Sequence, residues 1–307
     1  MDNEARRTLV VSYGMGLDST AMLVEMHNRG IRPDLVLFSN TGAEKPETYA
    51  YLDIIDAWLV KVGFPTVTVV SYDPPRAPYT DLESKCLANE TMPSIVFNPR
   101  TKHSCALVFK RDAMVKYLKG WKPGLAAIGR GERIVKAVGY DDSAADRKRR
   151  TRADAKTEKM RLKVLERTDV GKRPLAEMWE AAHCDFWYPL ADWGLDRAAL
   201  TKIIEAAGLP VPVKSACFFC PASKPEEVVE LKLKHPDLYR RAVEMERRAY
   251  EGKHARKRRA AGLSVIPGLG IGGWAWAWLA DCNDPAAAKA AIKEHGASVS
   301  EDDALRP

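Results

Sequence analysis

The chain has 307 residues, of which 46% are hydrophobic and 29% are charged, a balance typical of a globular protein rather than a disordered one. Its formal net charge of +7 and its pI of about 9.0 favour an anionic partner. No apolar run reaches the length of a membrane span, and residues 1–8 lack the apolar core of a secretory signal. We therefore expect a cytoplasmic protein without a membrane partner.

Strand and helix signals alternate over residues 8–70. Apolar, β-branched runs typical of strands occupy Thr8–Ser12, Leu35–Ser39 and Thr66–Val70, and helical patterns occupy Ser19–Arg29 and Glu47–Val62 between them. This βαβαβ order predicts an α/β fold with a Rossmann-like parallel sheet and helices on both faces. Such sheets bind their ligands at the carboxyl ends of the strands.

The middle of the chain combines shorter elements with a strongly basic stretch. Pro-rich residues Asp73–Tyr79 predict a loop, Phe109–Leu118 a short helix, and Leu125–Ile128 and Ile134–Val138 two further strands. Residues 147–173 are dense in Arg and Lys and poor in large apolar side chains. This composition is compatible with a solvated helix or mobile flap, and also with a surface that follows phosphates.

Two more helices are predicted towards the end of the chain, over Asp196–Ala207 and Pro225–Tyr250. We expect a first domain over residues 1–195, in which residues 147–173 are a basic insertion. A mainly helical, cysteine-bearing C-terminal region is expected over residues 196–307.

A glycine-rich turn joins the first predicted strand to the first predicted helix. It reads Ser12-Tyr13-Gly14-Met15-Gly16-Leu17-Asp18-Ser19-Thr20. Gly14 and Gly16 let the backbone approach a ligand closely, and the helix that follows presents unpaired N–H groups, so the turn favours an anion. No Gly-Lys-Ser/Thr follows, and Asp18 would repel a pyrophosphate unless a cation intervened, which argues against the Walker and dinucleotide patterns. A turn that is merely capped by Asp18 or Ser19 is the structural alternative.

The turn resembles the PP-loop, Ser-Gly-Gly-x-Asp-Ser, of ATP pyrophosphatases, and in particular its form in enzymes similar to phosphoadenosine-phosphosulfate (PAPS) reductase. Tyr13, Met15 and Leu17 stand where that form has Phe, Gly and Val. Two later stretches are also similar to motifs of this family. They are Asn40-Thr41-Gly42-Ala43-Glu44, and Gly139-Tyr140-Asp141 through Asp146-Arg147, and the likeness covers residues 9–251.

This resemblance implies an adenine-nucleotide-α-hydrolase-like fold of the PP-loop/HUP type, which binds ATP or a PAPS-like nucleotide with Mg²⁺. Asp18 and Ser19 would be catalytic, and Asp18 would bind the Mg²⁺. The implied nucleotide-binding residues are Ser12, Tyr13, Gly14, Met15, Gly16, Asp18, Ser19, Thr20, Asn40, Thr41, Gly42, Glu44, Gly139 and Arg147.

Six cysteines in a chain of this length are too few and too scattered for a secreted disulfide framework. Cys217 and Cys220 form a Cys-x-x-Cys pair, which can chelate a metal, hold part of an iron–sulfur cluster, or cycle as a dithiol. In the family that the chain resembles, such a pair faces a second cysteine-bearing stretch. This implies Cys86, Cys105, Cys217 and Cys220 as ligands of a 4Fe-4S iron–sulfur cluster, with zinc or free thiols as alternatives. Cys184 is the rival of Cys86 for the fourth position.

The function implied by these motifs is ATP-dependent sulfur transfer. A substrate would be adenylated with release of pyrophosphate, and would then receive sulfur from a cluster or from a cysteine persulfide. The expected acceptor is a nucleic acid, either DNA or tRNA, or a nucleotide, and the sulfur donor is a protein such as a cysteine desulfurase. One alternative is a PAPS or APS reductase, although no cysteine follows Cys282 to serve as its nucleophile. Another is a nucleotide- or nucleic-acid-binding module without turnover.

Overall fold

The computed structural model describes residues 7–73, 76–96, 105–166 and 176–295. The chain divides into two compact units. The first unit contains Met1–Asn40, Pro46–Ser71 and Lys110–Ser215, and the second contains Thr41–Lys45, Tyr72–Phe109 and Ala216–Pro307. This division differs from the boundary expected between residues 195 and 196, because residues 196–215 belong to the first unit and the second unit takes up two segments from the first half of the chain.

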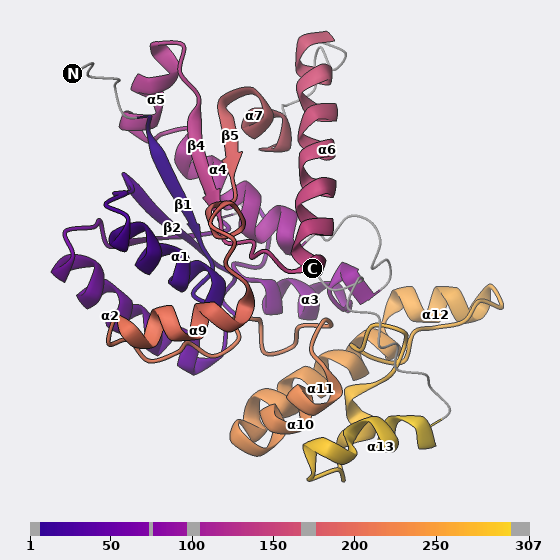
Figure 1. Ribbon diagram of the computed structural model, residues 1–307. Helices are drawn as coiled ribbons and strands as arrows, with labels where there is room; N and C mark the ends of the chain where they lie inside the picture. The colour runs from indigo at the N-terminus through magenta and orange to yellow at the C-terminus, as the bar shows by residue number, and fades with distance from the viewer. Residues whose placement is uncertain (1–6, 74–75, 97–104, 167–175, 296–307) are drawn as a thin grey trace, which may run out of the picture. The chain divides into compact units, whose positions relative to one another are not determined.

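The first unit is built on a five-stranded parallel sheet with strand order β3-β2-β1-β4-β5 (Figure 1). Its strands are β1 (Leu9–Tyr13), β2 (Leu35–Asn40), β3 (Val67–Ser71), β4 (Ile134–Val138) and β5 (Cys184–Trp187). In the central register, Val11 of β1 lies opposite Val36 of β2 and Ala137 of β4. These three residues are fully buried, and both faces of β1 and β2 are covered, which explains why the sequences of these two strands are apolar rather than alternating.

Helices cover both faces of this sheet. They are α1 (Leu17–Asn28), α2 (Pro46–Lys61), α4 (Ala113–Leu118), α5 (Lys122–Gly129), α6 (Ala144–Glu166), α7 (Ala176–His183), α8 (Pro189–Asp192) and α9 (Arg197–Ala206). Val11 enters a core that it shares with α1, α2, α8 and α9. Its neighbour Val10 enters another core, with α4, α5 and α7. The predicted α/β fold with a parallel sheet between two helical layers is therefore confirmed.

Two predicted elements of the sequence are wrong. Leu125–Ile128 is not a strand but part of α5, which Pro123 helps to start and which contains the helix formers Ala126 and Ala127. The predicted single helix over Pro225–Tyr250 is two helices, because Pro236 lacks an N–H and the residue before it has non-helical angles (φ −136°, ψ 68°). Strand β5 had no sequence prediction.

The second unit is mainly helical. It contains α3 (Leu82–Asn89), η1 (Ser94–Val96), α10 (Pro225–Lys234), α11 (Pro236–Glu251), α12 (Lys253–Ala260), η3 (Trp276–Leu279), η4 (Pro285–Ala287) and α13 (Ala288–Glu294). A π-helix, η2 (Cys105–Asp112), runs from this unit into the first. The buried Glu246 organises the Gly/Trp-rich tail, since its carboxylate accepts backbone hydrogen bonds from Leu269 (2.6 Å), Trp276 (2.7 Å) and Ala277 (3.1 Å). No helix among the described residues is both long and apolar enough to cross a membrane.

Candidate functional site

The glycine-rich turn lies at the topological switch point of the sheet, between β1 and β4, where the chain reverses its direction of winding. From β1 the chain proceeds to β2 and β3 on one side, and then returns to β4 and β5 on the other side of β1. The turns that follow β1 and β4 therefore flank the gap between the two halves of the sheet. In open α/β sheets this gap is the usual ligand position.

The backbone of the β1–α1 turn is shaped for an anion. Met15 has φ +56°, in the left-handed region that favours glycine, and its side chain is fully buried in the core. The Ser19 hydroxyl accepts a hydrogen bond from the Gly14 amide (3.1 Å) and donates one to the Gly16 carbonyl (3.3 Å). No side chain caps α1 at Gly16, so the first amides of this helix remain available to a ligand.

Three predicted nucleotide-binding residues have side chains that face the core instead of this turn. Tyr13, Met15 and Thr20 are at most 1% exposed, and the Tyr13 hydroxyl lies 3.1 Å from Oγ1 of Thr20. Burial raises the pKa of the Tyr13 phenol far above its usual range. These residues can contribute backbone groups to a site, and their side chains hold the turn in place.

Gly139, at the end of β4, packs directly on the start of α1. A Cβ atom at this position would lie 3.1 Å from the Ser19 amide nitrogen and 3.1 Å from the Asp18 carbonyl carbon. Any larger residue would push against the helix end that the turn presents. The structure thus joins two sequence motifs that are 120 residues apart into one local arrangement.

Asp18 is the most perturbed acidic group near the turn. Burial raises the pKa of its carboxyl to about 6, and the neighbouring Asp141 and Asp146 add to the rise, while Arg197 opposes it. An Arg197 Nη1 lies 3.7 Å from Asp18 Oδ1, which accepts no hydrogen bond from the described residues. The Ser12 hydroxyl oxygen is likewise buried without a hydrogen bond to the described part of the chain. Buried polar atoms of this kind normally have partners, so both oxygens are available to a ligand at the turn.

The loop after β4 fixes its acidic residues by local hydrogen bonds. The Asp141 amide donates to Asp146 (3.1 Å), whose carboxylate also accepts from Arg149 (2.8 Å). Arg147, a predicted nucleotide-binding residue, is more than half exposed and pairs with Asp142 at 3.6 Å. Its guanidinium is therefore held at the start of α6 by a neighbouring carboxylate.

The segment after β2 contains the other predicted nucleotide-binding residues. Asn40 accepts a hydrogen bond from the Tyr49 hydroxyl (2.9 Å) in the first unit. The next residues belong to the second unit, where Thr41 Oγ1 lies 3.1 Å from Cys217 Sγ and the buried Glu44 forms an isolated β-bridge with Cys217. Gly42 has φ +76° and lies so close to Asp81 that a Cβ atom would approach it to 2.5 Å. The predicted second nucleotide motif thus contacts the Cys-x-x-Cys pair.

The cysteines are divided between the two units. Cys86, Cys105 and Cys217 pack in or against the core of the second unit, and the Cys220 amide donates to the Cys217 carbonyl (2.9 Å). Cys184 lies on β5 in the first unit, where it packs in the sheet core. Burial raises the pKa values of Cys86 and Cys184 to about 12, so both thiols are neutral at ordinary pH.

The described residues contain no group of three or more His, Cys, Asp or Glu side chains placed to hold a metal. The four-cysteine cluster therefore stays a prediction. Of the two rivals for the fourth ligand, Cys86 shares a core with Cys105 and Cys217, whereas Cys184 belongs to another core.

Arg197 has no sequence signal of its own. It begins α9 and approaches Asp18 from 179 positions further along the chain. Asp141 belongs to a recognised motif, yet nothing in the sequence shows that its carboxylate is buried near Asp18. A scan of protein-family models and a search of curated proteins produced no match to the chain. The fold and the site define an α/β protein with a five-stranded parallel sheet and a candidate anion site at its switch point.

Proposed function

We propose that the chain is an ATP pyrophosphatase of the PP-loop type, which adenylates a substrate and prepares it for sulfur transfer. The observation that carries this proposal is the meeting of the β1–α1 turn with Gly139 at the switch point, beside a partly buried Asp18 that accepts no hydrogen bond on Oδ1 from the described residues. Mononucleotides of parallel α/β proteins bind at this position.

The residues of the turn can be given separate roles. Gly14, Gly16 and the first amides of α1 would bind the β- and γ-phosphates, because exposed N–H groups and the helix dipole both favour negative charge. Arg197 would add a flexible positive charge at the same place, since its side chain is 65% exposed and only loosely paired at 3.7 Å. Met15 supplies through its strained backbone the conformation that the family obtains with glycine.

Asp18 fits a role as a ligand of Mg²⁺. One carboxylate is sufficient, because Mg²⁺ in nucleotide sites takes one or two protein carboxylates and fills its other positions with water and phosphate oxygens. The ion would supply positive charge that offsets the crowded phosphates. Because the pKa of Asp18 is raised to about 6, binding of the ion would release a proton from Asp18 only below about that pH.

In the reaction, an oxygen of the substrate attacks the α-phosphorus of ATP. The bond between the α-phosphorus and the bridging oxygen breaks, pyrophosphate leaves with that oxygen, and the substrate oxygen carries AMP. The turn amides and Arg197 stabilise the negative charge that develops on the leaving pyrophosphate. The step needs no redox partner.

Sulfur transfer would follow at Cys217. A persulfide on Cys217, loaded by a donor protein of the cysteine desulfurase class, attacks the activated carbon, and AMP leaves with the substrate oxygen. Cys220 then attacks the resulting mixed disulfide, which releases the thiolated substrate and leaves a Cys217–Cys220 disulfide for an external dithiol to reduce. The contact of Cys217 with Thr41, a residue of the predicted second nucleotide motif, supports the choice of this thiol.

Calorimetric titration with ATP and Mg²⁺ tests the nucleotide site. The wild type should bind ATP, Asp18→Ala should lose the Mg²⁺-dependent part of the affinity, and Asp53→Ala, on the exposed side of α2, should match the wild type. Nucleotide binding that is unchanged in Asp18→Ala contradicts the assignment. Iron, sulfide and zinc analysis of protein purified without oxygen decides between the predicted cluster and the persulfide, because Cys217 and Cys220 cannot serve both. Protein that contains neither metal contradicts the cluster, and a bound cluster contradicts the persulfide step.

A further inference from the structure

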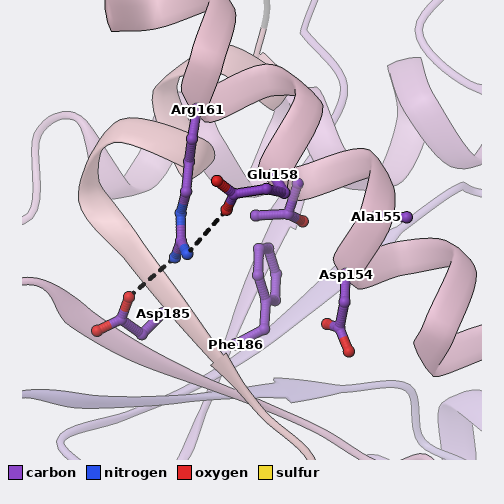
Figure 2. A pocket seen from close by; sticks show the side chains of 7 residues that line it. Asp154, Ala155, Glu158, Arg161, Asp185 and Phe186 are labelled. Atoms are coloured by element: carbon purple, nitrogen blue, oxygen red, sulfur yellow. Dashed lines mark hydrogen bonds and ion pairs between the residues drawn. The ribbon is translucent and has the colours of Figure 1, made fainter.

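Helix α6 carries nine Lys and Arg side chains, and the structure separates them into two groups. Five of them form ion pairs: Arg147 and Arg150 with Asp142, Arg149 with Asp146, Lys156 with Glu177, and Arg161 with Glu158 and Asp185. Figure 2 shows Arg161 reaching from α6 to Asp185 of β5, at the wall of a hollow of about 420 Å³. Most of these pairs fasten α6 to the rest of the first unit.

The remaining four cations form a row on another side of the helix. Lys148, Arg152, Lys159 and Lys163 make no ion pair with the described residues, and the first three are exposed. Their offsets from Lys148 are 4, 11 and 15 residues, which at about 100° per residue place all four within about 60° of one another. At about 1.5 Å per residue the row is about 22 Å long.

The row faces away from the packed side of α6. The half-buried residues Ala153, Thr157 and Val164 lie at about 140° to 180° from Lys148 around the helix, opposite the row. No acidic residue interrupts the row until Glu166, at the end of the helix. The four cations, named the α6 row from here on, therefore form a line of positive charge, which Lys148, Arg152 and Lys159 expose to solvent.

We infer that the α6 row binds the phosphodiester backbone of a nucleic acid that is the substrate of the proposed reaction. A line of cations separated by about 6 to 10 Å along one side of the helix suits a polymer whose negative charges are about 3.4 Å apart along each strand, because the long side chains can reach separate phosphates. The line starts two residues after Asp146, which contributes to the electrostatic surroundings of Asp18. A strand bound along α6 would therefore run towards the candidate ATP site.

The chemistry of the row fits a nucleic acid better than a membrane. Membrane-surface helices need a continuous apolar face opposite their cations, whereas the large exposed apolar residues of α6 are Leu162 and Leu165 near its end. No aromatic residue lies on α6, so base stacking does not contribute and the contacts are with the backbone. Binding should accordingly depend little on base sequence.

Helix α12 is also basic, but its charge is arranged differently. Its cations surround the helix, of which only Ala255 is buried, and the helix belongs to the second unit. Because it belongs to the second unit, α12 offers a second basic surface against which the α6 row can be tested. The part of this inference that makes the bound nucleic acid the substrate rests on the proposed function, whereas binding by the α6 row does not.

The test compares three variants with the wild type. The row variant is K148Q/R152Q/K159Q/K163Q, because glutamine removes the charge and preserves helix propensity. A matched variant removes four exposed lysines from other helices and loops of the first unit, K61Q/K119Q/K122Q/K202Q. A third removes Lys253, Arg256, Lys257 and Arg258 of α12 in the same way. Circular dichroism checks that all three fold.

Binding is measured with a labelled DNA duplex and with a labelled single-stranded RNA, over a series of salt concentrations. The row variant should bind at least tenfold more weakly near physiological salt. Its slope of log affinity against log salt should decrease by about 3.6 for the duplex or by about 2.8 for the single strand, and the larger absolute affinity identifies the preferred nucleic acid.

Affinity of the row variant within twofold of the wild type would overturn the inference, as would an equal loss in the matched variant or a loss confined to the α12 variant. Stronger binding of the wild type to phosphatidylserine vesicles than to either nucleic acid would overturn it too. ATP titration of the row variant separates the two proposals. If the row variant loses nucleic-acid binding but binds ATP normally, both the α6-row inference and the proposed function are supported. If the row variant loses nucleic-acid binding and the wild type does not bind ATP either, the inference about the α6 row stands and the proposed function is contradicted.

Discussion

Replacing Asp18 by Asn is expected to stabilise the folded protein at neutral pH and to abolish its function. Asn has nearly the same shape as Asp but carries no charge to desolvate. The Asp18 side chain is only 30% exposed, and burial raises the pKa of its carboxyl from 3.8 to about 6. Keeping this group ionised at neutral pH therefore costs folding free energy.

The size of the effect follows from the pKa. A rise of roughly two units corresponds to about 3 kcal/mol of differential stability between the protonated and ionised forms. Because the folded-state pKa is above the unfolded value, the folded state binds more protons between pH 3.8 and about 6, and wild-type stability falls over this interval as the pH rises. The exposed, loosely paired Arg197 should subtract little from the gain in the variant.

The assay is urea unfolding of wild type and Asp18→Asn without nucleotide or Mg²⁺, at a series of pH values. The variant should be more stable by up to about 3 kcal/mol at pH 7.5, and the difference should vanish below about pH 4. Other titrating groups cancel in the comparison. A variant less stable than the wild type at pH 7.5, or a difference independent of pH, would refute the desolvation argument.

Three further substitutions test individual parts of the structure. Gly139→Ala should weaken ATP binding at least tenfold in calorimetry, because its Cβ would press on the start of α1 at 3.1 Å, whereas Gly129→Ala, where a Cβ meets nothing within 4 Å, should bind normally. Met15→Gly relieves a φ of +56°, worth about 1–2 kcal/mol, but removes a fully buried side chain worth about 2–5 kcal/mol, so a rise in Tm would be inconsistent with the packing. Glu246→Ala removes the acceptor of two buried backbone N–H groups and of the part-buried N–H of Ala277, and should cost about 3 kcal/mol in urea unfolding. An unchanged midpoint would show that the carboxylate does not hold the tail.

The elements of the sheet could be predicted because their signals are local. Apolar runs predict strands β1 to β3, and helical periodicity predicts helices α1 and α2. Strands β1 to β4 begin and end within one residue of their predicted limits. The prediction of a strand over Leu125–Ile128 is wrong because a short apolar run does not distinguish a strand from a helix by its period. Pro123 at the helix start and the alanines that follow favour the helix that is observed. Pro236 divided a helix whose apolar pattern continued across it.

The candidate site was predictable only where it is contiguous in sequence. Gly14, Gly16, Asp18 and Ser19 lie in one turn, so their spacing already indicates an anion site. Arg197 could not be found in this way, because only the packing of α9 on α1 brings it to Asp18. The discontinuous second unit escaped prediction for the same reason.

The basic stretch shows most clearly what the structure adds. The sequence marks residues 147–173 as one charged region, of which residues 167–173 lie outside the described part of the chain. In α6, carboxylates from four different segments take up five of the nine cations, so charge density alone overstates the available surface. Helical spacing then shows that the other four cations, the α6 row, lie on one side of the helix.

The central claim, attack at the α-phosphorus of ATP, is tested most directly by identifying the products from ATP labelled separately at the α- and γ-positions. The reaction contains wild-type protein, Mg²⁺ and the nucleic acid that it binds, with Asp18→Ala as the inactive comparison and Asp53→Ala as the control. The account predicts pyrophosphate together with AMP, or AMP attached to the substrate, in wild type and Asp53→Ala but not in Asp18→Ala. Release of inorganic phosphate and ADP, or equal pyrophosphate release by Asp18→Ala, would contradict it.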